Sequence, residues 1–195
     1  MSLKLNKLIA GAALSLLAGT AAQAQTVLKV HHFLPSGSSS QVKIIAPWCA
    51  KIEKESGGEL KCQIYPAMQL GGTPPQLLDQ VRDGVADIVW SVPTYSAGRY
   101  TKSEVFELPF MAINAKQGSQ ALWEYVQKNA LDEYKGIKPL FMHTTEGYVL
   151  HSNKPILKLE DMKGKKIRTA TRISARMMSA MGGTPVQMPL PQVPD

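Results

Sequence analysis

Between Thr26 and Val92 strand-like and helix-like patterns alternate, and this alternation is the feature that most limits what the chain can fold into. Three β-rich runs lie at Thr26–Phe33, Glu59–Tyr65 and Ala86–Val92. They are separated by helix-like segments from Ser38 to Glu55 and from Gln76 to Asp83. The third run is apolar on both faces, as a buried parallel strand is. The order predicts an α/β fold with a parallel sheet and right-handed crossovers.

Helix signals in this region agree with that order. Ser38 to Ser40 supply N-cap candidates for the first helix, and Pro47 is expected to kink it or to set a new first turn. Thr73 can cap the second helix, with Pro74 in its first turn. Gly84 follows that helix and is expected to end it.

Beyond Val92 the pattern predicts the rest of a first domain and the start of a second. Phe106–Met111 is expected to be extended because residues before proline avoid the helical region. A helix is predicted over Ala115–Tyr134 and a strand over Lys138–Thr144. Glu146–Pro155 is predicted to cross between two domains in a strand-like conformation. We therefore expect residues 25–147 to form a first α/β domain with a mainly parallel sheet, and residues 148–195 to begin a second.

The two ends of the sequence carry expectations of their own. Lys4 and Lys7 precede an uncharged apolar stretch from Leu8 to Thr20, and Ala22-Gln23-Ala24 supplies small residues for cleavage. This pattern predicts a signal peptide over residues 1–24 and export to the periplasm; an uncleaved membrane anchor is the alternative. At the other end, the chain stops at Asp195 where another helix is expected to begin, so we expect the second domain to be truncated.

Charge and cysteine content limit the partners and the redox state. The formal net charge is +7, but the basic residues are scattered and no zinc-finger spacing occurs, so nucleic acid is not an expected partner. Cys49 lies on the apolar stripe of the first helix and Cys62 on one face of the second strand. Both thiols are expected in the layer between helix and sheet, either as a disulfide or as two buried free thiols.

The stretch Leu159–Thr169 contains the most promising binding residue. It is predicted to form one helical turn, a left-handed glycine at Gly164 and a short strand. In that strand Ile167 and Arg168 point to opposite faces, so a buried Ile167 directs Arg168 away from the core. A guanidinium at a strand end can bind a carboxylate through two hydrogen bonds. The alternative is a solvated surface arginine.

No catalytic or cofactor motif accompanies these elements. The sequence has no nucleophile elbow, phosphate-binding loop or dinucleotide fingerprint, and no metal or cofactor is expected. His31 and His32 are adjacent in a strand, so they point to opposite faces and cannot chelate one ion. Aromatic residues follow the strands at the edge where parallel sheets bind ligands, and they either line a cleft or simply cover the sheet.

Several short segments, weak alone, give a specific resemblance when taken in order. They are Glu55–Leu60, Tyr65–Pro66, Gln69–Gly71, Gln80–Asp87, Phe106–Phe110, Ser152–Ile156, Asp161–Arg168 and Gly182–Val186. From about Val27 to Asp195 the chain resembles the DctP-type extracytoplasmic solute receptors of TRAP transporters. The resemblance implies a type II-like periplasmic binding protein, with two α/β domains around a cleft, that passes an organic acid to membrane permease subunits. It implies a binding protein and not an enzyme, and we expect a monomer.

The resemblance also implies roles for single residues. The arginine of the Gly-Lys-Lys-Ile-Arg segment, here Arg168, pairs with the ligand carboxylate. A second basic group often lies four residues before the serine of Ser-Asn-Lys-Pro, but this chain has Tyr148 there. We infer a monocarboxylate with a bulky, possibly aromatic body, stacked among Phe33, Trp90, Tyr95 and Tyr148. A carboxylate-sensing domain is the alternative function, although no kinase or membrane segment follows.

Overall fold

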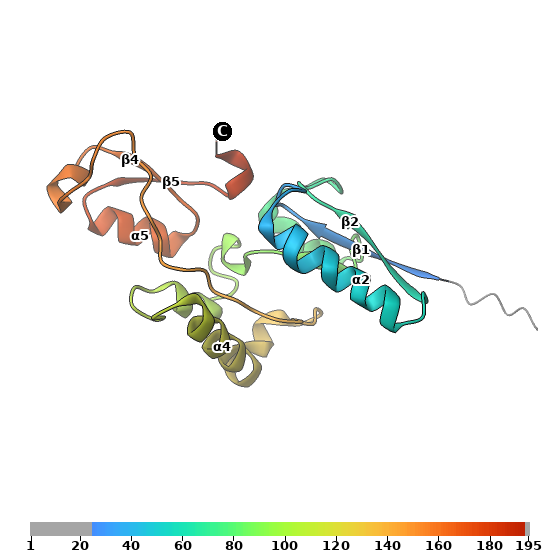
Figure 1. The fold of residues 1–195 in the computed structure, drawn as a ribbon. Helices are drawn as coiled ribbons and strands as arrows, with labels where there is room; N and C mark the ends of the chain where they lie inside the picture. The colour runs from blue at the N-terminus through green and yellow to red at the C-terminus, as the bar shows by residue number, and fades with distance from the viewer. Residues whose placement is uncertain (1–24, 194–195) are drawn as a thin grey trace, which may run out of the picture.

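The computed structural model describes residues 25–193, so the predicted signal peptide lies outside the described residues. Figure 1 shows two groups of elements joined by a long connection. In chain order the strands are β1 (Thr26–His32), β2 (Leu60–Tyr65), β3 (Ile88–Trp90), β4 (Lys166–Thr169) and β5 (Thr184–Gln187). The α-helices are α2 (Ala46–Glu55), α3 (Leu77–Arg82), α4 (Ala115–Tyr125) and α5 (Arg172–Ala180). The shorter helical turns are η2 (Gln41–Ile45), η3 (Pro74–Gln76), η4 (Pro93–Tyr95), η5 (Ser103–Glu107), η6 (Val126–Ala130), η7 (Leu131–Tyr134), η8 (Leu159–Met162) and η9 (Leu190–Gln192).

The first group is built on a three-stranded parallel sheet in the order β2–β1–β3. This confirms the α/β pattern expected from the alternation of strands and helices. Pro47 lies at the start of α2 after a π-helical turn, so it sets a new first turn. Helix α2 covers one face of the sheet, where Val30, Ile45 and Cys49 form a buried cluster. A disulfide joins Cys49 of α2 to Cys62 of β2 in that same layer.

A second cluster of apolar side chains lies around α4 and the turns that follow it. Tyr100, Leu122, Val126, Ala130 and Tyr134 are buried together there. The rings of Tyr100 and Tyr134 lie 5.0 Å apart. This cluster ties the segment after β3 to α4, so the region that carries η4 and η5 is anchored to the first group.

The second group is smaller and consists of a two-stranded parallel sheet with α5 packed on it. Gly164 has a φ of 76° at the turn before β4, as expected for a left-handed glycine. Thr171 caps α5 by accepting a hydrogen bond from the backbone N–H of Ser174. Thr184 N donates to Lys165 O at 2.8 Å and so fixes the register of the two strands.

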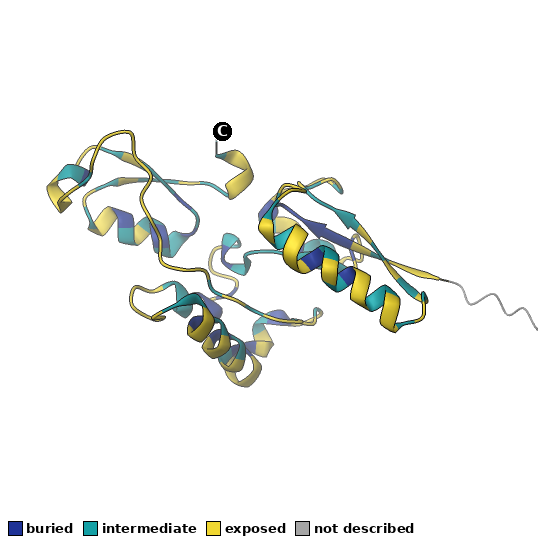
Figure 2. Cartoon of the chain, viewed as in Figure 1, coloured by how far each residue is buried: buried dark blue, intermediate teal, exposed yellow. Residues whose placement is uncertain are grey.

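The connection between the two groups differs from the predicted strands. Neither Lys138–Thr144 nor Glu146–Pro155 forms a regular strand in the structure, and most of both segments is exposed (Figure 2). Their backbones lack a neighbouring strand among the described residues, and a ladder needs that partner. The predicted domain change at residue 148 falls within this connection and stays a prediction.

The segment Phe106–Met111, predicted to be extended, is extended only in part. Phe106 and Glu107 belong to the 3-10 turn η5 and are not extended. Leu108, directly before the proline, is extended with a ψ of 143°, as the steric argument requires. Among the helices the structure describes, none has the length and apolar character needed to cross a membrane.

Candidate functional site

Arg168 projects from the face of the small sheet opposite to α5. A Cβ built on Gly183 would lie 3.3 Å from Met178 and 3.4 Å from Ile167, so Ile167 packs in the layer between the sheet and α5. Side chains alternate along a strand, and this places Arg168 on the other face. The orientation predicted from the sequence is therefore confirmed.

Only part of the Arg168 guanidinium is satisfied by the protein. Its Nε donates to the backbone oxygen of Met188 at 3.0 Å, and this bond fixes the plane of the group. Its Nη2 is buried and has no hydrogen-bond acceptor within residues 25–193. A buried unpaired donor costs free energy, more so when it is charged. Arg168 is thus oriented by one bond and keeps a donor for an anionic acceptor.

Tyr148 lies on the exposed connection, and charged groups of the site act on its hydroxyl. The residue as a whole is 63% exposed. Loss of water around the hydroxyl nevertheless raises the pKa of Tyr148; Glu107 and Tyr95 raise it further, while Arg168 lowers it. Glu107 and Arg168 therefore act on the pKa of Tyr148 in opposite directions.

The four aromatic residues predicted to surround the ligand fall into two sets. Phe33 and Tyr95 form one contact, with ring centroids 5.7 Å apart, and Tyr95 also acts on the titration of Tyr148. Trp90 packs in a different set, with its ring 5.3 Å from Phe141 and 4.9 Å from the imidazole of His143. The structure therefore pairs Phe33 with Tyr95, whereas Trp90 packs against Phe141 and His143 of the connection.

The sequence reasoning missed Glu107, which joins the two groups of elements. Its carboxylate accepts hydrogen bonds from the hydroxyl of Thr94 in η4 and from the hydroxyl of Thr171 at the start of α5. In the sequence, Glu107 stands out only as the single acidic residue in the apolar run Phe106–Phe110. An acidic residue in such a run needs polar partners, but the sequence does not tell which residues supply them.

The buried histidine pair is hydrogen-bonded to other residues of the first group. The backbone N–H of Leu70 donates to His31 Nε2 at 3.4 Å, so the Nδ1 proton is given to Gln80 at 2.8 Å. His32 is likewise satisfied as the neutral ring, by Gln41 at 2.9 Å and by the N–H of Leu34. Burial lowers the pKa of both histidines. In the described part of the chain no cluster of His, Cys, Asp and Glu is arranged to hold a metal ion.

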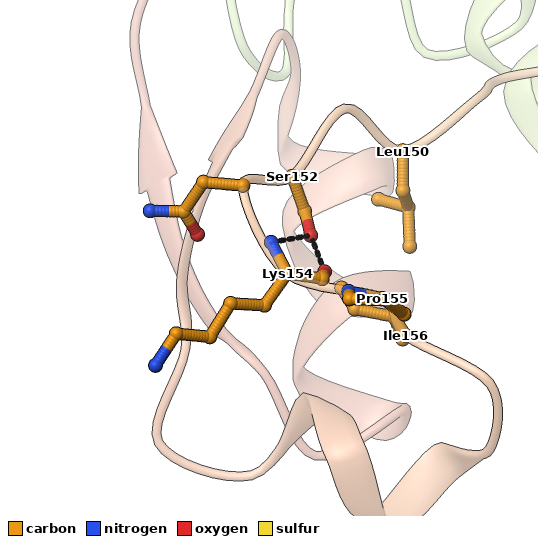
Figure 3. Close-up of a pocket in the computed structure, with 6 residues that line it drawn as sticks. Leu150, Ser152, Lys154, Pro155 and Ile156 are labelled. Atoms are coloured by element: carbon orange, nitrogen blue, oxygen red, sulfur yellow. Dashed lines mark hydrogen bonds between the residues drawn. The ribbon is translucent and has the colours of Figure 1, made fainter.

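An open hollow of about 340 Å³ lies on the connection between the two groups. Figure 3 shows its lining, in which the Ser152 hydroxyl bonds to the backbone of Lys154 and the Leu150 and Ile156 side chains form an apolar side. Neither Arg168 nor the aromatic residues line it. We favour Arg168 as the site because it combines a fixed charge with an unpaired buried donor, whereas the hollow contains no such group.

Comparisons with known proteins agree with this picture. The profile of the family described as bacterial extracellular solute-binding protein, family 7 (DctP) matches residues 30–193. A solute-binding protein of Albidiferax ferrireducens is 27% identical over 188 residues, which is 92% of this chain and 55% of the relative.

Solved structures resemble the chain more strongly. A TRAP solute-binding protein of Rhodoferax ferrireducens, solved with copurified benzoate, is 46% identical, with a TM-score of 0.82 over 85% of this chain and 52% of that chain. A marine metagenome TRAP solute-binding protein, solved with 3-hydroxybenzoate, is 47% identical with the same TM-score and the same coverage. The chain therefore spans about half the length of the relatives it matches.

Proposed function

From the premise that this chain belongs to the DctP family of bacterial extracellular solute-binding proteins, we propose that it binds a monocarboxylate with an aromatic body through Arg168. The family consists of TRAP solute receptors and not of enzymes. The observation that carries the proposal is the buried Nη2 of Arg168, which lacks an acceptor in the described part of the chain. A carboxylate oxygen is the acceptor that a guanidinium binds most strongly.

Two features favour an aromatic monocarboxylate over other acids. Phe33 and Tyr95 offer a ring wall, and aromatic rings prefer such tilted or edge contacts. Where the family often has a second basic residue, this chain has the phenol of Tyr148, so one charge fewer is present for a second carboxylate. The two similar structures solved with benzoate and 3-hydroxybenzoate support the same ligand class.

The proposal also covers the location and the membrane partner, and family membership supports both. Several relatives are named as periplasmic binding proteins, and a periplasmic location for this chain is part of the proposal. Delivery to permease subunits of a TRAP transporter belongs to it as well. Binding by closure of two domains around the ligand is the expected working principle.

The proposal is tested by titrating the protein with benzoate and following the side-chain NMR signals of its arginines. Saturable shifts of Arg168 Nε are expected, and benzoate at a hundredfold excess over its Kd is expected to stabilise the protein by about 2.7 kcal/mol in thermal unfolding. Sodium acetate serves as the control for a bare carboxylate and is expected to bind more weakly, because it buries no ring.

The Arg168→Ala variant should weaken benzoate binding about tenfold to a hundredfold, because a hydrogen bond to a charged group is lost. Arg168→Lys keeps the charge but not the fork and is expected to recover only part of the affinity. The matched control is Arg176→Ala, which removes an exposed arginine from α5. Equal benzoate affinity in the Arg168→Ala and Arg176→Ala variants would contradict the proposal.

A further inference from the structure

Glu107 forms a polar bridge between the two groups of elements. Its Oε1 accepts a hydrogen bond from Thr94 Oγ1 and its Oε2 accepts one from Thr171 Oγ1. Both threonines are almost fully buried, at 6% and 1% exposure. Hydrogen bonds to an ionised acceptor are about twice as strong as neutral ones. One carboxylate thus binds a hydroxyl from each side.

The two threonines lie beside the two parts of the candidate site. Thr94 directly precedes Tyr95, whose ring packs on Phe33. Thr171 follows Arg168 by three residues and caps α5. A displacement of either threonine therefore displaces the ring wall or the strand end that carries the guanidinium. The side chain of Glu107 links Thr94 to Thr171 by hydrogen bonds to their hydroxyl groups.

A second carboxylate on η5 reinforces the bridge. Glu104 is 3% exposed, and Arg172, the first residue of α5, donates from its Nε to both Glu104 oxygens, at 2.7 and 2.9 Å. Residues three apart on a 3-10 turn lie on the same side, so Glu104 and Glu107 both reach the start of α5. The turn η5 therefore makes two contacts with the group that contains Arg168.

The other end of η5 is fixed within the first group. Glu133 of η7 accepts hydrogen bonds from the backbone N–H groups of Lys102, at 2.7 Å, and Ser103, at 3.1 Å. The hydroxyls of Ser103 and Tyr134 lie 2.9 Å apart. The turn is thus held to the α4 cluster at one end and contacts α5 and η4 with its two carboxylates.

We propose that Glu107 is a positioning residue, and that it sets the spacing between Arg168 and the ring wall of Phe33 and Tyr95. This inference rests on the proposed function. Aromatic acids differ in the distance between ring and carboxylate, so a fixed spacing selects among them. Loss of the Glu107 bridge is expected to let the two parts shift and to reduce that selection.

The test compares benzoate with phenylacetate, whose carboxylate lies one methylene further from the ring. The ratio of the two dissociation constants is measured by NMR titration in the wild-type chain and in Glu107→Gln. An amide of the same size cannot accept both hydroxyl protons equally well, because its nitrogen is a donor. In Glu107→Gln we expect the ratio of the two dissociation constants to come closer to one, by about threefold or more.

The matched control is Glu133→Gln, which alters a carboxylate that holds η5 but touches neither Thr94 nor Thr171. It weakens the hold on the start of η5 but leaves the Glu107 contacts with Thr94 and Thr171 in place, so it is expected to leave the ratio unchanged. Thr94→Val provides a second route, because it removes one of the two donors, and Thr94→Ser restores the hydroxyl and should restore the wild-type ratio. These two variants decide the matter if Glu107→Gln fails to fold.

The outcomes separate this inference from the proposed function. If the wild-type chain binds neither acid, the proposed function fails and the inference fails with it. If the wild type binds, and Glu107→Gln or Thr94→Val binds with an unaltered ratio, the proposed function stands and the positioning role is overturned. A ratio that shifts equally in Glu133→Gln also overturns it, because general loosening would then explain the effect.

Discussion

The β2–β1–β3 sheet and the β4–β5 sheet are both parallel, yet they are stabilised by different means. The first has three strands, a disulfide to α2 and two fully buried histidines with hydrogen-bond partners. The second has two strands of four residues, with α5 against one face. Near it, Leu157 and Leu159 are 87% and 63% exposed.

The two parts of the candidate site lie in groups that differ in stability. The ring wall belongs to the heavily stabilised group, whereas Arg168 belongs to the lightly covered one. Small sheets with little buried area are the regions that open most easily. Alignment of the two parts therefore depends on the contacts that join them, and these are the η5 carboxylates and the connection that carries Tyr148.

Removal of the disulfide is expected to have the largest effect on the difference in stability between the two sheets. Cys49 and Cys62 are 13 residues apart, and a bridge over a loop of this size stabilises a protein by about 3 kcal/mol through the unfolded state. The Cys49→Ala/Cys62→Ala variant should therefore lose about that much free energy of unfolding in the first group. Amide hydrogen exchange in β1 and β2 measures it residue by residue.

The same exchange experiment contains its own control. Amides of β4 and β5 are expected to keep their protection, because neither cysteine contacts that sheet. If the protection of both sheets falls together, the two groups unfold as one cooperative unit and the contrast between them is not one of stability.

Acidification is also expected to destabilise the first group. Burial lowers the pKa of His31 and His32, so the unfolded chain binds more protons than the folded one below the unfolded value of about 6.5. Their contribution to stability is complete above that pH and is lost as the pH falls toward the folded pKa, by up to about 1.4 kcal/mol per pH unit for each histidine.

Urea unfolding between pH 7.5 and pH 5 measures this slope. Asp79 does not interfere in this pH range. Hydrogen bonds from Arg99 lower the pKa of its carboxyl group, so its contribution to stability is lost only at a pH below the usual carboxyl range. His151→Gln is the control, since His151 is exposed on the connection. A slope that is flat in the wild type, or that disappears in His151→Gln, would show that the buried pair is not its source.

The same contrast explains which features the sequence could predict. The strand–helix alternation, the left-handed Gly164 and the outward face of Arg168 depend on neighbours in the chain, and all three are found. The strand expected at Lys138–Thr144 depends on a partner strand, which local patterns do not specify. Glu107 was missed because its partners lie 13 and 64 residues away, and the position of Trp90 depends on Phe141 in the same way.

The smallest expected effect is a change in the pKa of Tyr148, and it tests most directly whether the two groups meet. Glu107 raises the pKa of Tyr148 and Arg168 lowers it, so Glu107→Gln should lower this pKa and Arg168→Gln should raise it. The 13Cζ signal of Tyr148, assigned by its loss in Tyr148→Phe, follows the titration in alkaline solution. Opposite shifts in the two variants mean that one hydroxyl senses a charge from each group, and therefore that η5 and β4 meet at Tyr148. Shifts of the same sign would instead indicate that both substitutions merely open the connection to water.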